Sequence, residues 1–122
     1  MLKKKNTLKV KSTHFDSKGA AKMVDVSNKK VSTRVASAEA TIAMKAATLK
    51  MIIEGNHKKG DVLAVARIAG ILGAKKTSDL IPLCHPIGIE TVEINFQFDK
   101  KNNTVKIFCI CKTTNKTGIE IE

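Results

Sequence analysis

The chain has 122 residues, which fits one domain, and 43% of them are hydrophobic, which excludes a disordered polar chain. It carries 22 lysine and arginine residues against 11 acidic residues, and the formal net charge of +11 fits a small polyphosphate ligand, a nucleic-acid backbone or, for most of the lysines, simply a solvated surface. The sequence holds no apolar run that could span a bilayer, no signal peptide and no CxxC pair among its three cysteines, so a cytoplasmic protein is expected.

The first third of the chain predicts extended structure. Residues 1–12 are expected to form a flexible basic tail ahead of a single domain over residues 13–122. Met23–Val26 is a short apolar run bounded by polar residues, and it predicts a short strand. Residues 31–44 are rich in Val, Thr and Ala, so they also predict extended chain.

Two helices are predicted next. The first covers Thr48–Glu54, where the apolar residues share one face, and it ends at Gly55. The second begins at Asp61, which is a good N-cap residue. Apolar residues at helical spacing predict that this helix continues to about Ala74.

The second helix contains two glycines and is followed by two lysines. Gly70 and Gly73 each cost roughly 1 kcal/mol relative to alanine inside a helix. Close packing against another element is therefore the expected reason for them. Lys75 and Lys76 are expected at the C-terminal end of the helix, where its dipole favours cations.

The last predicted elements form a hairpin. Residues 91–99 alternate between apolar and polar side chains, which predicts a half-buried strand. Residues 104–112 predict the return strand after a Lys-Lys-Asn-Asn turn. The order of strand, helix pair, strand and strand predicts an α+β fold with an antiparallel sheet. A ferredoxin-like β-α-β-β-α-β unit would need one more helix and one more strand after residue 122.

The first group of candidate functional residues is cationic. Lys59 lies just before the second helix, where free backbone N–H groups and a lysine together make an anion site and a lysine can transfer protons. Arg67 and Lys75 follow on the same helix, and with Lys59 they could hold several phosphate charges. Alternatively, the turn at Lys59 is simply solvated, and Asp79 or Glu120 pairs with one of the two helical cations.

The second group is Cys84–His85, which lies between Pro82 and Pro86. A residue before proline is driven out of helical geometry, so this step is predicted to be non-helical. No further ligands stand at finger-like spacing, so no metal site is expected. A nucleophilic cysteine–histidine pair would lack a third member, and His85 is better interpreted as a positioned hydrogen-bonding or proton-transfer group.

The third group is the pair of carboxylates near the C-terminal end. Glu120 and Glu122 alternate with Ile119 and Ile121. In extended chain the two carboxylates share one face, since successive side chains of a strand point in opposite directions. They could then orient an amine-rich, purine-derived ring or balance nearby lysines, and an ordinary exposed charged segment is the alternative.

In combination, several of these segments resemble the cyclic pyranopterin monophosphate synthase family (molybdenum cofactor biosynthesis protein C). The resemblance covers roughly residues 13–122, and its most specific string is Asp-Leu-Ile-Pro-Leu-Cys-His-Pro at 79–86. The other matching segments are His14–Asp16, Met23–Ser27, Lys59–Ile71, Ala74–Thr77 and Lys116–Glu122, with Ile121 at the position where the family usually has methionine.

The resemblance implies a lyase without a cofactor. The family converts 3′,8-cyclo-7,8-dihydroguanosine 5′-triphosphate to cyclic pyranopterin monophosphate and pyrophosphate. It has a ferredoxin-like α+β fold with helices on one face of the sheet, and its dimers group into a hexamer with each site at a subunit interface. The implied partners are therefore the triphosphate and further copies of the chain, rather than nucleic acid or a membrane.

Roles for individual residues follow from the same resemblance. Lys59 and His85 match catalytic positions of the family. The matching substrate-binding residues are Leu83, Cys84, His85, Ile121, Glu122, Arg67, Lys75 and Glu120.

The family continues beyond the point that matches residue 122, into a long helix and a catalytic aspartate. General acid–base catalysis typically supplies about 10²–10⁴-fold in rate, so this sequence is expected to be an incomplete synthase domain with little or no activity. Two alternatives stay open. One is a basic nucleic-acid-binding module, although Tyr and Trp for base stacking are absent. The other is a catalytically dead partner that lends Lys59 and His85 to a site shared with a full-length subunit.

Overall fold

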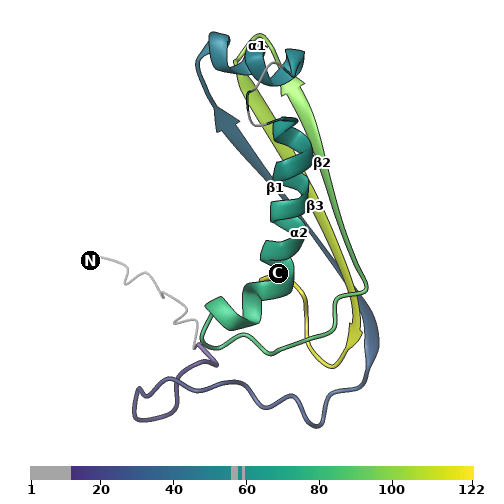
Figure 1. Cartoon of the computed structure of the whole chain (residues 1–122). Helices are drawn as coiled ribbons and strands as arrows, with labels where there is room; N and C mark the ends of the chain where they lie inside the picture. The colour runs from purple at the N-terminus through teal and green to yellow at the C-terminus, as the bar shows by residue number, and fades with distance from the viewer. Residues whose placement is uncertain (1–11, 56–57, 59) are drawn as a thin grey trace, which may run out of the picture.

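The computed structural model describes residues 12–55, 58 and 60–122, so most of the predicted tail at residues 1–12 lies outside the described residues. The sheet has three strands, which form one long layer with α2 (Val62–Leu80) along one face and α1 (Ala46–Glu54) at one end (Figure 1). The predicted α+β fold with an antiparallel sheet is confirmed. In chain order the elements are β1 (Ser32–Ala43), α1 (Ala46–Glu54), α2 (Val62–Leu80), β2 (Thr91–Asp99) and β3 (Thr104–Asn115).

The central strand of the sheet is β3, because the strand order is β1-β3-β2. It pairs antiparallel with both neighbours, so β1 and β2 run parallel to each other with β3 inserted between them. This is the split β-α-β arrangement of ferredoxin-like folds. Pairing of Ser32 with Asn115 carries β3 past the predicted end at residue 112.

Short-range signals set the end of α1, the start of α2 and the end of β2 as predicted. Gly55 ends α1 in the left-handed region, with φ of 68°. Asp61 caps α2, and its side chain accepts hydrogen bonds from the backbone N–H groups of Leu63 and Ala64 at 3.0 and 3.1 Å. Asp99 starts the β2–β3 turn, where its carboxylate accepts two backbone N–H bonds at 3.0 Å each.

Helix α2 packs on β2 through one of its two glycines. A Cβ atom at Gly70 would overlap the end of the Ile94 side chain, so only glycine permits this close approach. Beside this contact, the Arg67 guanidinium donates through Nε to the Ile94 carbonyl at 2.9 Å and lies 5.6 Å from the centroid of the Phe96 ring. Gly73 faces open space, so the packing explanation is confirmed for Gly70 and is wrong for Gly73.

The predicted C-terminal end of α2 at Ala74 is wrong, because the helix continues to Leu80. Lys75 and Lys76 consequently lie inside the helix, and its last turn holds no basic residue. The physical stop is Pro82, since the residue before a proline is disfavoured in helical geometry.

The strand predicted at Met23–Val26 is also wrong. This segment has no regular structure, and the nearest pairing is an isolated antiparallel bridge between Phe15 and Ala21. Val24 and Val26 alternate, as in a strand, but they turn their side chains toward a cavity instead of a sheet neighbour.

The buried core lies near the C-terminal half of α2. Ala74, Cys111 and Ile119 form its centre, packed with partly buried side chains from β1, β2 and the connection before β2. Other apolar side chains of α2 and of the edge strand β1 are exposed. Val65 of α2 is 60% accessible and Val35 of β1 is 62% accessible. Within the described part of the chain, neither helix has both the length and the apolar character to cross a membrane.

Candidate functional site

A cavity of about 250 Å³ opens at the end of the sheet where the core lies. Three irregular segments enclose it, at residues 12–29, 81–90 and 116–122, and none of them belongs to a helix or strand. Its lining residues are Thr13, His14, Val24, Val26, Lys29, Leu83, Cys84, His85, Thr117, Gly118, Glu120, Ile121 and Glu122.

The Cys84–His85 step enters the cavity because α2 stops just before it. The Ile81 N–H donates to the Thr77 carbonyl at 2.9 Å as the helix ends, and the Cys84 N–H donates to the Ile81 carbonyl at 3.3 Å in the turn that follows. From residue 84 to residue 89 the chain has no regular structure, so the predicted non-helical geometry is confirmed. His85 is half-buried in the cavity wall.

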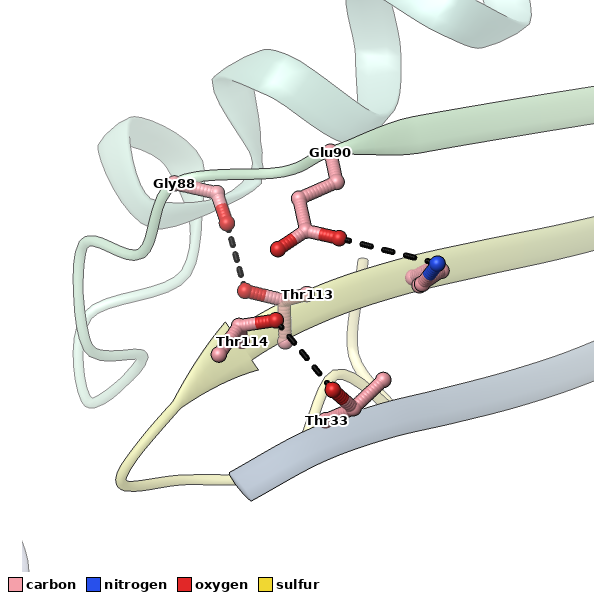
Figure 2. Close-up of polar contacts among 6 residues, drawn as sticks. Thr33, Gly88, Glu90, Thr113 and Thr114 are labelled. Carbon is pink, nitrogen blue, oxygen red and sulfur yellow. Dashed lines mark hydrogen bonds and ion pairs between the residues drawn. The ribbon is translucent and has the colours of Figure 1, made fainter. Parts of the chain in front are cut away.

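Figure 2 shows that the segment at 81–90 is tied to the end of β3, and the segment at 116–122 follows directly from that strand. The hydroxyl of Thr113, which is wholly buried, donates to the Gly88 carbonyl, and Glu90 pairs with Lys112 at 3.9 Å. The β3 residue Thr114 also contacts Thr33 of β1 through their hydroxyls at 3.4 Å. The sheet thus positions a site that it does not itself line.

The C-terminal segment is anchored by one apolar side chain. Ile119 is 2% exposed and packs against Ala74 and Cys111 in the core. The residues on either side of this anchor, Gly118 and Glu120, both line the cavity. The alternation of isoleucine and glutamate at residues 119–122 therefore buries Ile119 in the core and places the two carboxylates at the cavity.

Cys84 and Glu122 meet across the cavity. The Cys84 thiol donates to Oε1 of Glu122 at 3.2 Å. Burial and the hydrogen bond to Glu122 raise the pKa of Cys84 to about 11. A thiolate is the nucleophilic form of cysteine, so the shift disfavours the cysteine–histidine nucleophile and makes Cys84 a neutral donor that orients Glu122. Burial likewise raises the pKa of the core thiol of Cys111 to about 11.

The second carboxylate is positioned through a glycine. The Glu120 carboxylate folds back over Gly118, where a Cβ atom would overlap both of its oxygens. Glu120 is exposed on its outer side and lines the cavity on the other. Glycine at 118 is thus a requirement for this placement of the Glu120 carboxylate.

Two of the three predicted cations do not line this cavity. Lys59 lies outside the described residues, so its placement is not given. Arg67 and Lys75 are exposed on α2 and do not line the cavity. Among the ion pairs of the described residues, neither of them pairs with Asp79 or Glu120.

Among the described residues, the lysine that lines the cavity is Lys29. The sequence analysis gave no site role to Lys29, nor to His14, Val24 and Val26, which also line it. Asp25 lies in the same stretch, and its pKa is lowered, chiefly by the hydrogen bond from the Ser27 N–H and to a smaller extent by the charge of His85. The alternation of Val24 and Val26 was a usable signal, because it marks one side of the segment as facing inward.

The donors around the cavity do not converge as a metal centre does. Among the described residues, no group of three His, Cys, Asp or Glu side chains could hold a metal ion. The site instead combines imidazoles, carboxylates, a lysine and a neutral thiol over apolar walls. Such a set can bind a polar heterocycle by hydrogen bonds and move protons on it.

The fold and the cavity thus define an α+β protein with a candidate small-molecule site. Residues 23–122 match the MoaC family, and the chain belongs to that family. A cyclic pyranopterin monophosphate synthase of Parvibaculum lavamentivorans is 53% identical over 112 residues, which are 92% of this chain and 70% of the relative.

Proposed function

We propose that the chain is a cyclic pyranopterin monophosphate synthase, a lyase of molybdenum-cofactor biosynthesis. In the reaction that the resemblance implies, 3′,8-cyclo-7,8-dihydroguanosine 5′-triphosphate is converted to cyclic pyranopterin monophosphate with release of pyrophosphate. The observation that carries the proposal is the meeting of Leu83, Cys84 and His85 with Glu120, Ile121 and Glu122 in one cavity. These two stretches lie far apart in the sequence, and both match substrate-binding segments of the family.

The cavity suits the ring system of the substrate. At about 250 Å³ it is smaller than the roughly 300–1,000 Å³ of sites that enclose a whole drug-sized ligand. We assign to it the purine-derived ring, whose amine groups would donate to Glu120 and Glu122. His85 would transfer protons on that ring, and Leu83 with Ile121 would supply its apolar walls.

The triphosphate is assigned to Lys59, Arg67 and Lys75. Arg67 and Lys75 do not line the cavity of their own chain, so they would serve the site of a neighbouring copy. This agrees with the hexamer assembled from dimers, and with the sites at subunit interfaces, that the resemblance implies. Lys59 is proposed as the second proton-transfer group, and the protein is proposed to act in the cytoplasm.

The test is the affinity of the full chain for the cyclised guanosine triphosphate, measured by calorimetry, with pyrophosphate release recorded beside it. His85→Ala and Lys59→Ala are each expected to weaken binding about tenfold or more, because each removes a hydrogen bond or a charge contact to the ligand. Lys58→Ala is the matched control for Lys59, since Lys58 is an exposed neighbour of the same charge.

Unchanged affinity in both His85→Ala and Lys59→Ala would refute the proposed site. A random DNA duplex is titrated in parallel at two salt concentrations. Strong, salt-dependent binding to the duplex without binding to the triphosphate would refute the synthase assignment, because counterion release is the signature of nucleic-acid contact.

A further inference from the structure

The segment that carries His85 leaves the sheet at a defined point. The backbone pairing of β2 with β3 ends with the Glu90 N–H, which donates to the Lys112 carbonyl at 2.8 Å. The side chains of these two residues pair at the same place, with 3.9 Å between the carboxylate and the ammonium. Residues 84–89, which precede this point, have no regular structure and include part of the cavity wall.

One side chain continues the contact where the backbone pairing of the two strands stops. Thr113 follows Lys112 in β3, and its hydroxyl donates to the Gly88 carbonyl (Figure 2). Among the contacts of the described residues, this is the one hydrogen bond that the backbone of residues 86–89 makes. The direction in which the segment leaves the sheet therefore depends on a single hydroxyl group.

The two partners of this hydrogen bond differ in their exposure. Thr113 is wholly buried, on the face of β3 that also carries the core residue Cys111. Gly88 is exposed, so its carbonyl could accept a hydrogen bond from water if the hydroxyl were removed. Loss of the hydroxyl would then release the segment from the sheet without leaving a buried carbonyl unpaired.

The contact is also close to His85 along the chain. Gly88 follows His85 by three residues, and Pro86 lies between them. The fixed φ of proline limits how far the two residues can move independently. His85 lines the cavity, so a shift of the Gly88 carbonyl should displace the imidazole relative to the other walls.

We propose that Thr113 is a positioning residue for His85, whose hydroxyl holds the Gly88 carbonyl and through it the cavity wall that carries the imidazole. Thr113 does not itself line the cavity, so it acts without touching a ligand. The consequence for binding rests on the proposed function, whereas the placement of the imidazole does not. An effect is predicted on the wall at residues 81–90, and none on the carboxylates at residues 116–122.

Variants of the full chain separate the hydroxyl from the rest of the side chain. Thr113→Val keeps the branched shape and removes the donor, Thr113→Ala is a second variant without the donor, and Thr113→Ser keeps it. Thr114→Val is the matched control. Thr114 is the next residue of β3, and its hydroxyl contacts the Thr33 hydroxyl at 3.4 Å on the opposite face of the sheet.

The first measurement needs no ligand. NMR records the imidazole resonances of the three histidines, and His85→Ala identifies those of His85. The His85 resonances are expected to shift in Thr113→Val and Thr113→Ala, and to keep their wild-type positions in Thr113→Ser and Thr114→Val. His14, in the other wall of the cavity, is the internal control. Unchanged His85 resonances, or equal shifts for His14 and His85, would overturn the proposal.

The second measurement is the affinity for the cyclised guanosine triphosphate, by calorimetry. Thr113→Val is expected to weaken binding about threefold to tenfold, and Thr113→Ser and Thr114→Val should stay within about twofold of the wild type. In a His85→Ala background, Thr113→Val should cause no further loss, whereas in a Glu120→Gln background it should cause its full loss. A full further loss without the imidazole would refute action through His85.

The two proposals can fail separately. If the wild type does not bind the cyclised nucleotide, the proposed function fails, and the NMR measurement still decides the role of Thr113. If the wild type binds it and the His85 resonances are unchanged in both variants without the donor, the role of Thr113 is refuted and the proposed function is retained.

Discussion

The sheet with α2 and the cavity at its end are built in different ways. The sheet is regular, with β3 paired to both neighbours over nearly its full length, and α2 approaches β2 closely at Gly70. The cavity is enclosed by irregular segments, which are held by single side chains and individual hydrogen bonds. Stability therefore resides mainly in the first region, and the candidate chemistry in the second.

The two regions meet at the core near Ile119. Its side chain packs against Ala74 of α2 and Cys111 of β3, while its neighbours along the chain face the cavity. A change at this residue should affect both regions, whereas changes farther out should affect one of them.

The largest effect is expected from Ile119→Ala. Removing a fully buried isoleucine typically costs about 2–5 kcal/mol of unfolding free energy. Ile119 is 2% exposed, so the loss should lie in this range in urea denaturation. Ligand affinity should fall with it, because the segment that carries Glu120 and Glu122 loses its anchor.

Ile110→Ala is the control for Ile119. Ile110 lies on the other face of β3 and is 41% exposed, so its truncation should cost less than about 1 kcal/mol. Equal losses for the two isoleucines would contradict the assignment of the core to one face of the sheet.

A smaller effect on the unfolding free energy is expected from alanine substitutions at the two glycines of α2. Comparing the two variants separates the effect of packing from that of helix propensity. Both Gly70→Ala and Gly73→Ala gain about 1 kcal/mol of helix propensity. Gly70→Ala must also displace the Ile94 side chain, and such overpacking costs about 1–3 kcal/mol. Gly73→Ala meets no atom, so it should be net stabilising.

The difference in unfolding free energy between the two glycine variants isolates the packing contribution, because the propensity gain is common to both. It is measured by urea denaturation of each variant. Two alanine variants of equal stability would show that α2 does not depend on close approach at Gly70.

The regular region could largely be predicted from the sequence, for physical reasons. The alternation in residues 91–99 has the period of a strand, and Asp61 and Gly55 act on groups within a few residues of themselves. One error arose where distant contacts decide, because β3 extends to Asn115 by pairing with β1. Another was local, since α2 continues past the lysine pair to Leu80 and Pro82 is the stop.

The cavity could be predicted only in part. The proline-framed step at Cys84–His85 and the alternating glutamates were identified as candidates, and the resemblance joined them in one site. The resemblance matched His14–Asp16 and Met23–Ser27 but gave them no place in the site. Their position in the cavity wall was missed, because irregular segments that meet across long sequence distances show no helix or strand periodicity.

The smallest effect on stability, and the sharpest separation of the two regions, is expected from Gly118→Ala. The new methyl group would occupy the place of the Glu120 carboxylate, which lies at the end of a flexible and exposed side chain. Moving such a group should change the unfolding free energy by no more than about 0.5 kcal/mol. Affinity for the cyclised nucleotide should nevertheless fall about tenfold, since the carboxylate leaves its position over Gly118.

A double-mutant cycle decides whether Gly118 acts through Glu120. If the methyl group only displaces that carboxylate, then Gly118→Ala combined with Glu120→Gln should bind no more weakly than Glu120→Gln alone. Calorimetry measures the four affinities, and urea denaturation checks that all four proteins are equally folded. Additive losses would mean that the methyl group obstructs the ligand itself, and the glycine would then be required for the space of the cavity and not for the placement of a carboxylate.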